Sequence, residues 1–262
     1  NIFKGVRVFT SLKILYIFCD DGWSRKRGEP VIELTKEFAT TIQSLGKLTS
    51  LSLGGILLNG PPEGTQSIDH LCSGLKALQH LKILRLDSTF MQGTDWRRLA
   101  ETLSSTSKLT ELKITSNRTA GTRRFDTEDP TVELLSRMFQ YQSNMTSFNT
   151  NRSGYGHKCI AALSRLNSTS LTHLDVTGNA LILNKYGTFK YPFELKKIMP
   201  NFGFLSNVEN LRMASTRLSY REIPTLIQAI EHMEQLKEVD FSDNDSLLVQ
   251  WSLDSAKPLF HA

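Results

Sequence analysis

Apolar residues recur along the chain in a hexad whose first, fourth and sixth positions are apolar. In LTHLDVTGNALI, residues 171 to 182, these positions are Leu171, Leu174 and Val176. Spacings of three and then two fit neither a helix nor a simple alternating strand. The hexad begins at residues 12, 48, 81, 109, 145, 171, 208 and 236, and Thr150 is the one polar residue at a sixth position.

The hexads begin 26 to 37 residues apart. A repeat of this length marks a solenoid, because each unit is too small to bury its own apolar face and must stack on its neighbours. Eight units are enough for a continuous core, so the spacing predicts one domain over residues 1–262.

Helical periodicity replaces the hexad pattern between the predicted strands. Apolar faces of this kind occur in residues 31–46, 67–78, 95–103 and 221–233, and their positions are Leu34, Phe38, Ile42 and Leu45; Ile68, Leu71, Cys72, Leu75 and Leu78; Trp96, Leu99 and Leu103; and Ile223, Leu226, Ile227 and Ile230. Asp129 before Pro130 reads as the N-cap of a further helix. The sequence therefore predicts parallel strands with right-handed helical crossovers, strands on the concave side and helices on the convex side.

This organisation resembles leucine-rich repeats of the long type found in ribonuclease inhibitor and in the C-terminal region of NOD-like receptors. In that family the ninth position is usually Asn or Cys, whose side chain bonds to backbone groups after the strand. The ninth positions here are Asp20, Ile56, Thr89, Asn117, Ser153, Asn179, Thr216 and Asn244, so the repeats are divergent. The resemblance implies an α/β leucine-rich repeat solenoid, or horseshoe, with about eight strands.

Composition indicates the cellular compartment in which this solenoid is expected to work. The chain is 39% hydrophobic and 22% charged, and no apolar run is long enough for a membrane span. It begins with Asn1 in what resembles the tail of a preceding repeat, which indicates a fragment of a larger chain. Three separate cysteines without a CxxC pair favour the cytosol, against N-x-S/T sequons at Asn117, Asn144, Asn151 and Asn167.

Catalytic and cofactor signatures are missing from the sequence. The six histidines have no metal-ligand spacing, and GGILLNGPPEG, residues 54 to 64, lacks the GK[ST] of a phosphate loop. There is no GxSxG motif and no plausible set of nucleophile, base and orienting group. We therefore expect no enzyme activity, no cofactor and no metal.

Four longer segments separate a predicted strand from the following helix, at residues 20–30, 54–66, 118–130 and 180–192. In a parallel solenoid they emerge on one rim, where insertions often form a binding face, although they are equally consistent with tolerated surface loops. Aromatic and arginine side chains are common interface anchors, and the candidates among the rim loops are Trp23, Arg25, Arg27, Arg123, Arg124, Phe125, Tyr186 and Lys190. The net charge of +5 favours an acidic partner, whereas nucleic acid would need a denser basic stripe.

The third, fifth and seventh positions of each hexad unit point away from the core and form the concave face. Its first strand offers Tyr16 and Phe18, its third strand offers Arg85, and its last strand offers carboxylates. This gradient suits a macromolecular ligand, or else the apolar end packs on preceding repeats.

The resemblance implies a ligand-recognition and autoinhibitory domain of a cytosolic NOD-like innate immune receptor. Its partner would be a protein ligand or a neighbouring domain of the same chain. Two alternatives remain, an inhibitor or scaffold that binds through the concave face, and an accessory resembling the GTPase-activating protein of Ran. No arginine of this sequence matches the role that the second alternative requires.

Overall fold

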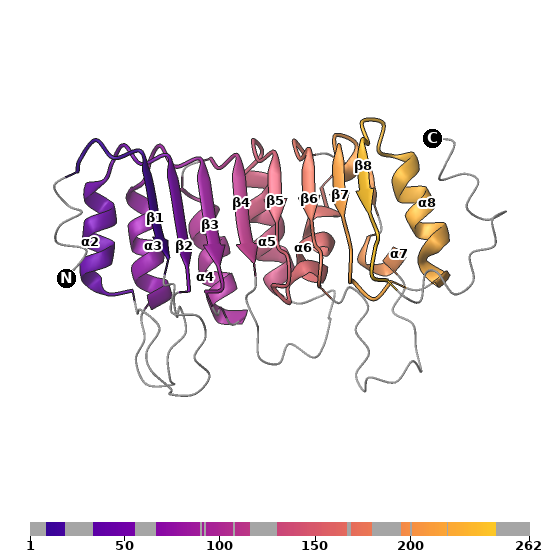
Figure 1. The fold of residues 1–262 in the computed structure, drawn as a ribbon, viewed down its shortest axis with the longest axis horizontal. Coiled ribbons are helices and arrows are strands. Elements are labelled where there is room, and N and C mark those ends of the chain that lie inside the picture. The colour runs from indigo at the N-terminus through magenta and orange to yellow at the C-terminus, as the bar shows by residue number, and fades with distance from the viewer. Residues whose placement is uncertain are drawn as a thin grey trace. The chain divides into compact units, whose positions relative to one another are not determined.

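The eight hexads form eight strands in the computed structural model of the chain. The structure describes residues 9–18, 34–55, 67–89, 91, 93–106, 108–115, 130–166, 169–179, 195–199, 201–218 and 220–244. The strands make one open parallel sheet in the order of the sequence (Figure 1). They are β1 Ile14–Phe18, β2 Ser50–Gly54, β3 Ile83–Asp87, β4 Glu111–Thr115, β5 Ser147–Asn149, β6 His173–Asp175, β7 Asn210–Arg212 and β8 Glu238–Asp240.

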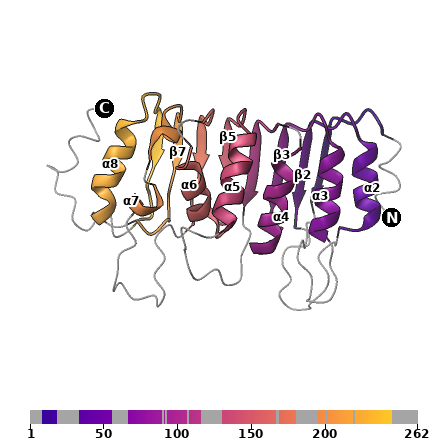
Figure 2. The ribbon, with the colours of Figure 1, turned by 180° about the vertical axis from the view of Figure 1, so that it is seen from behind.

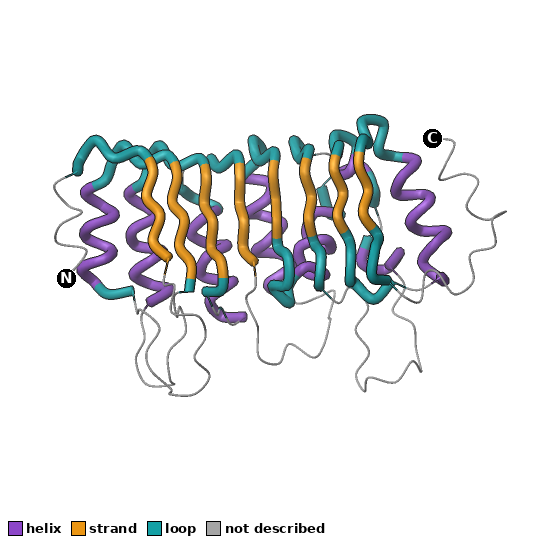
Figure 3. Tube along the Cα trace, viewed as in Figure 1, coloured by secondary structure: helices purple, strands orange, loops and turns teal. Residues whose placement is uncertain are grey.

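Helices alternate with these strands, which confirms the predicted α/β leucine-rich repeat solenoid. The helices are α2 Lys36–Ser44, α3 Ser67–Ala77, α4 Gly93–Leu103, α5 Pro130–Tyr141, α6 Gly156–Leu163, α7 Leu195–Ile198 and α8 Ile223–Glu231, with 3₁₀ turns η1 Gly203–Leu205 and η2 Tyr220–Glu222. In each part of the chain they pack behind the strands, as the reverse view and the tube drawing show (Figures 2 and 3).

The chain divides into two compact units whose boundary falls within α5. Unit 1 comprises Asn1–Ala120 and Arg137–Met145, and unit 2 comprises Gly121–Ser136 and Thr146–Ala262. Unit 1 holds β1 to β4, each of five residues, and unit 2 holds β5 to β8, each of three.

The core of unit 1 is made by the predicted hexad and helix positions. Leu51, Leu84 and Leu112, the fourth positions of three hexads, are fully buried. Phe38, from α2, and Trp96, from α4, are the large side chains that pack behind them. Burial of such side chains, at about 25 cal/mol per Å² of apolar surface, is what holds stacked repeats together.

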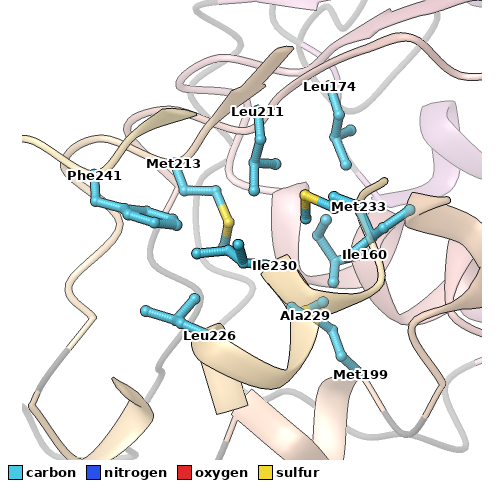
Figure 4. Close-up of a pocket in the computed structure, with 11 residues that line it drawn as sticks. Ile160, Leu174, Met199, Leu211, Met213, Leu226, Ala229, Ile230, Met233 and Phe241 are labelled. Carbon is cyan, nitrogen blue, oxygen red and sulfur yellow. The ribbon is translucent and has the colours of Figure 1, made fainter. Parts of the chain in front are cut away.

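The core of unit 2 follows the same rule but is looser at its C-terminal end. Apolar side chains of β6, β7, α6, η1 and α8, together with residues next to α7 and β8, surround an interior void of about 10 Å³ (Figure 4). The last helix, α8, buries Leu226, whereas Ile223, Ile227 and Ile230 stay half-buried. The predicted face of 221–233 is therefore only partly enclosed.

A left-handed residue follows the strand in all six repeats whose eighth position lies within the described residues. At the eighth position φ is +66° at Gly55, +53° at Ser88, +53° at Arg152, +69° at Gly178, +53° at Ser215 and +55° at Asp243. Its N–H continues the sheet by donating to the seventh-position carbonyl of the next repeat, as from Ser88 to Thr115 at 2.9 Å. The turn thus aims the chain towards its helix without interrupting the hydrogen-bonded ladder.

The ninth-position asparagines bind the turns together, as the family resemblance implied. Asn179 is buried, and its Oδ1 accepts from the N–H groups of Gly154 at 2.8 Å and Gly156 at 3.2 Å. Its Nδ2 donates to the carbonyls of Thr150 at 2.7 Å and Val176 at 2.9 Å. One amide therefore satisfies backbone groups of two successive repeats, which a buried turn requires.

Asn244 repeats this arrangement two repeats further along unit 2. Its Oδ1 accepts from the N–H groups of Thr216 and Leu218, both at 3.0 Å, and its Nδ2 donates to the Met213 carbonyl at 2.9 Å. The ninth positions Asp20, Ile56 and Asn117 lie outside the described residues.

The exceptional sixth position, Thr150, is explained by this same turn. Thr150 is fully buried, and its hydroxyl shares a hydrogen bond with that of Ser153, the ninth position of its own repeat. Ser153 Oγ also lies 3.2 Å from Asn179 Oδ1. A polar residue is tolerated there because its hydroxyl is paired.

Two helix predictions need correction. The helix predicted from residue 31 begins at Lys36, because the Thr35 hydroxyl caps it by accepting from the Phe38 N–H at 3.4 Å. The bounds of α6 were not predicted, because its eight residues are all buried and so show no polar face. The predicted helix start at Pro130 is confirmed, while its cap Asp129 lies outside the described residues.

Candidate functional site

The side chains at positions three, five and seven lie on the side of the sheet away from the helices, which we call the open face. Figure 1 views the strands from this side. Parallel register aligns equivalent positions of successive strands, as Ser50 pairs with Ile83 and Ser52 with Arg85. The open face is therefore an ordered array of side chains that the core does not need.

In unit 1 the open face begins with large apolar side chains on β1. The exposed fractions are 50% for Ile14, 56% for Tyr16 and 57% for Phe18. The Phe18 ring lies over Gly54, where an added Cβ would fall 2.3 Å from a ring carbon. The small residues of β2, which are Ser50, Ser52 and Gly54, thus lie beside the larger side chains of β1.

The predicted open-face residues of β2 are small and are buried beside larger side chains of β1 and β3. Ser50 is 5% exposed and Ser52 is fully buried, although both face away from the helices. Ser52 Oγ makes no hydrogen bond with any residue in the described ranges. The neighbouring side chains of β1 and β3 are large enough to cover it.

Charged residues of β3 and β4 complete this part of the face as matched pairs. Arg85 binds Glu111 through two bonds of 2.6 and 3.1 Å, and Lys113 lies 3.3 Å from Asp87. The pKa of Arg85 is raised, first by its hydrogen bond to Glu111 and less by the nearby charges of Glu111, Tyr16 and Asp87. The two cations and two carboxylates cancel, so this part of the face carries no net charge.

In unit 2 the open face is polar. Its third positions are Ser147, His173, Asn210 and Glu238, and its fifth positions are Asn149, Asp175, Arg212 and Asp240. Seven of these eight residues line a hollow of about 300 Å³, and Asp240 does not.

Short acceptor side chains fix the fifth positions of unit 2. Asn149, Asp175 and Asp240 each accept at 2.9 Å from the N–H two residues further on. This local turn is typical of Asn and Asp. For Asp240, hydrogen bonds from the side chain and backbone of Ser242 lower the pKa, with a smaller effect from Arg212.

Arg212 lies in register between Asp175 and Asp240. Its guanidinium lies 2.9 Å from Glu238 Oε1. The pKa of Arg212 is raised, first by the hydrogen bond to Glu238 and by its charge, and then by Asp175 and Asp240.

The predicted binding residues divide between described and undescribed parts of the chain. The structure brings Tyr16, Phe18 and Arg85 onto one open face in unit 1. The rim candidates Trp23, Arg25, Arg27, Arg123, Arg124, Phe125, Tyr186 and Lys190 lie outside the described residues. The four long segments do separate a strand from a helix, after β1, β2, β4 and β6.

Metal binding and cysteine reactivity are the other candidate chemistries of the described residues. Among the described residues no cluster of three or more His, Cys, Asp or Glu could hold a metal. Cys72 and Cys159 are buried free thiols whose pKa is raised chiefly by desolvation, which is the opposite of what a reactive cysteine needs. Within these ranges, none of the helices combines the length and hydropathy of a membrane span.

Comparison with solved structures identifies the fold. The leucine-rich repeat-containing protein LegL7 of Legionella pneumophila matches 97% of this chain and 73% of its own, with a TM-score of 0.50 and 17% identity. The fold is that of leucine-rich repeat proteins. An internalin of Listeria monocytogenes matches 96% of this chain and 69% of its own, with a TM-score of 0.36 and 14% identity. No protein-family model and no curated protein sequence matches the chain.

Proposed function

We propose that this chain is a protein-binding domain which recognises its partner through the open face of the sheet. The observation that carries the proposal is the row of Ile14, Tyr16 and Phe18, each half-exposed or more on one strand. A contiguous group of exposed large apolar side chains marks an interaction surface more often than a solvated one. Aromatic side chains are also the usual energetic anchors of interfaces.

The sheet supports binding because its side chains stand on a rigid scaffold. The alternate positions of the same strands, such as Leu51 and Leu53, are fully buried. Open-face substitutions therefore change the surface while the packed face stays in place. The helices of each unit lie behind its strands (Figure 3), so they do not cover the open face.

A narrower role follows from the family resemblance, and it is also proposed. In it the chain recognises a ligand in a cytosolic NOD-like innate immune receptor and restrains a neighbouring domain until that ligand arrives. Irregular repeat lengths and the buried, unpaired thiols of Cys72 and Cys159 support this setting. The full-length sequence tests it, since a P-loop nucleotide-binding module upstream would support the role and its absence would contradict it.

The rim loops remain a second proposed contact. Arg25, Arg27, Arg123, Arg124 and Lys190 would steer an acidic partner or domain by raising the local positive potential. Replacing Arg123 and Arg124 with Glu should slow association, more so at low salt. An unchanged association rate would remove the rim from the proposal.

The open-face proposal is tested by mapping binding on the two sides of the sheet. A photo-crosslinking amino acid would be placed at Tyr16, and in a separate protein at Lys76, an exposed residue of α3. The crosslinked partner would then be produced pure and its affinity measured by calorimetry for Tyr16→Ala and Lys76→Ala. We expect about a tenfold loss for Tyr16→Ala, because truncated aromatic anchors typically cost more than 1 kcal/mol.

Lys76→Ala is the control for the helix side and should leave affinity unchanged. Its thermal unfolding, and that of Tyr16→Ala, should match the wild type, since neither side chain is part of the core. A partner whose affinity falls with Lys76→Ala and not with open-face variants would place the binding surface on the helices and contradict the proposal.

A further inference from the structure

We propose that the open face of unit 2 binds an extended segment of a partner protein that carries lysine or arginine side chains. The inference rests on the proposed function and adds the chemistry of the partner. The surface consists of the third and fifth positions of β5 to β8, and its charged residues are Asp175, Arg212, Glu238 and Asp240.

Charge is the first reason. Asp175, Glu238 and Asp240 surround the single guanidinium of Arg212, which leaves an excess of two negative charges when His173 is counted as neutral. The chain as a whole carries a net charge of +5. This patch therefore runs against the protein's overall charge and selects a cationic partner by charge complementarity.

Preorganisation is the second reason. Asp175 Oδ1 and Asp240 Oδ1 accept at 2.9 Å from the N–H groups of Thr177 and Ser242. Asp175 Oδ2 accepts from Asn149 Nδ2, also at 2.9 Å. Carboxylates held in place before binding lose little conformational freedom when a cation arrives.

Shape is the third reason. The hollow of about 300 Å³ is lined by residues of all four strands, β5 to β8. That volume is at the lower limit for a small-molecule pocket and suits a few side chains of a longer chain. Asp175 and Asp240 are two strands apart, about 10 Å, which is within reach of arginines at alternate positions of an extended segment about 7 Å apart.

Arg212 provides a test in which the expected change in affinity has an unusual direction. Its guanidinium is bound to Glu238 at 2.9 Å, and Arg212 lies in register between Asp175 and Asp240. A cation from the partner must share these carboxylates with Arg212. Removing Arg212 should therefore strengthen binding, which is unusual for a residue in the centre of an interface.

The experiment uses the whole chain and a labelled short peptide of alternating arginine and serine, followed by fluorescence anisotropy at low salt. A peptide of alternating glutamate and serine is the opposite-charge probe. We expect Asp175→Asn and Asp240→Asn each to weaken arginine-peptide binding by about two- to fivefold, as for other solvent-exposed ion pairs. Arg212→Gln should strengthen it by a similar factor.

Glu231→Lys is the matched control, since Glu231 is an exposed acid at the end of α8 on the helix side of unit 2. Asp240→Lys makes the same change in charge on the open face. Asp240→Lys should weaken the arginine peptide more than tenfold, and Glu231→Lys by less than twofold. Equal effects of the two would show attraction to overall charge only and would overturn the inference.

The remaining outcomes separate this inference from the proposed function. Preference for the glutamate peptide on the open face, or no peptide binding while a partner crosslinks there, overturns the inference alone. Self-association of the chain that disappears in Asp240→Lys, measured by sedimentation, would make a second copy the occupant and also overturn it. Crosslinking confined to the helix side contradicts both.

Discussion

The open faces of the two units display different chemistry on the same repeat scaffold. In unit 1, Tyr16 and Phe18 lie exposed beside the small residues of β2, and the charges of Arg85 and Lys113 are paired. In unit 2 the equivalent rows are polar and carry excess negative charge around Arg212. The packed hexad positions stay apolar in both units except at Thr150, so surface chemistry varies independently of the core.

The strands differ in length for a related reason. In unit 2, Asn149, Asp175 and Asp240 each capture a backbone N–H two residues on, which turns the chain out of the strand after position five. The β7 strand, which has Arg212 at this position, lies between β6 and β8 and ends with them. The fifth positions of unit 1 are not Asn or Asp, and its strands continue to position seven.

The turn chemistry gives the largest expected difference between the units. Asn179→Ala should lower the free energy of unfolding by about 3 kcal/mol, because it leaves several buried backbone groups without partners. Thr89→Ala, the ninth position of a unit 1 repeat, should cost about 1 kcal/mol, since a hydroxyl makes fewer hydrogen bonds than an amide. Urea unfolding measures both.

Asn179→Asp sharpens this test because it keeps the size and the acceptor but removes the two N–H donors. At neutral pH it should be at least as destabilising as the alanine variant. If Asn179→Asp were as stable as the wild type, the bonds to the Thr150 and Val176 carbonyls would not hold the turn.

The contact of the Phe18 ring with Gly54 of β2 should give a stability effect of intermediate size in unit 1. Gly54→Ala places a methyl group 2.3 Å from a Phe18 ring carbon, so the ring must move. We expect a loss of about 1–2 kcal/mol, as for other overpacked sites. The loss should largely vanish in a Phe18→Ala background. A double-mutant cycle followed by thermal unfolding measures this coupling, and additive effects of the two substitutions would contradict the contact.

The eighth position should behave alike in the two units. Ser88→Gly and Ser215→Gly replace residues at φ +53° with one that adopts this conformation freely. Each should gain about 0.5–1 kcal/mol, because relief of left-handed strain exceeds the extra entropy of the unfolded glycine. Destabilisation of either protein in urea would mean that the serine hydroxyl matters more than the backbone.

The smallest effect concerns Asp240 and acid. Because the pKa of Asp240 is lower in the folded chain than in the unfolded one, its contribution to stability is present above about pH 4 and is lost as pH falls through the folded value. Solvent screening limits this contribution to about 0.5 kcal/mol. Asp240→Asn retains the turn and should flatten this part of the stability–pH curve, and an unchanged curve in urea titrations would contradict the assignment.

The sequence predicted the fold well because one spacing controls it. The hexads fixed the place of each strand, and the helix faces of 67–78 and 95–103 are buried as predicted. The bounds of the α6 helix escaped prediction because all of its side chains are buried, including those of His157 and Lys158. Periodicity reveals a helix only when one of its faces remains polar.

The candidate site was less predictable because it depends on contacts between repeats. The hexad positions placed Tyr16, Phe18 and Arg85 on one face, but nothing in them indicated that the Phe18 ring would lie over Gly54. Aligning successive hexads would have placed Arg85 diagonally across from Glu111, and Arg212 between Asp175 and Asp240. Net charge alone suggested an acidic partner, whereas the rows of unit 2 favour a basic one.

Hydroxyl-radical footprinting of the chain with and without its purified crosslinked partner tests the central claim most directly. Tyr16, Phe18 and His173 report on the open faces, while His70 of α3 and Tyr220 of η2 report from elsewhere. The account predicts that oxidation of the first three slows several-fold on binding and that of His70 and Tyr220 does not change. Protection of His70 and Tyr220, with Tyr16, Phe18 and His173 oxidised as in the free chain, would contradict it.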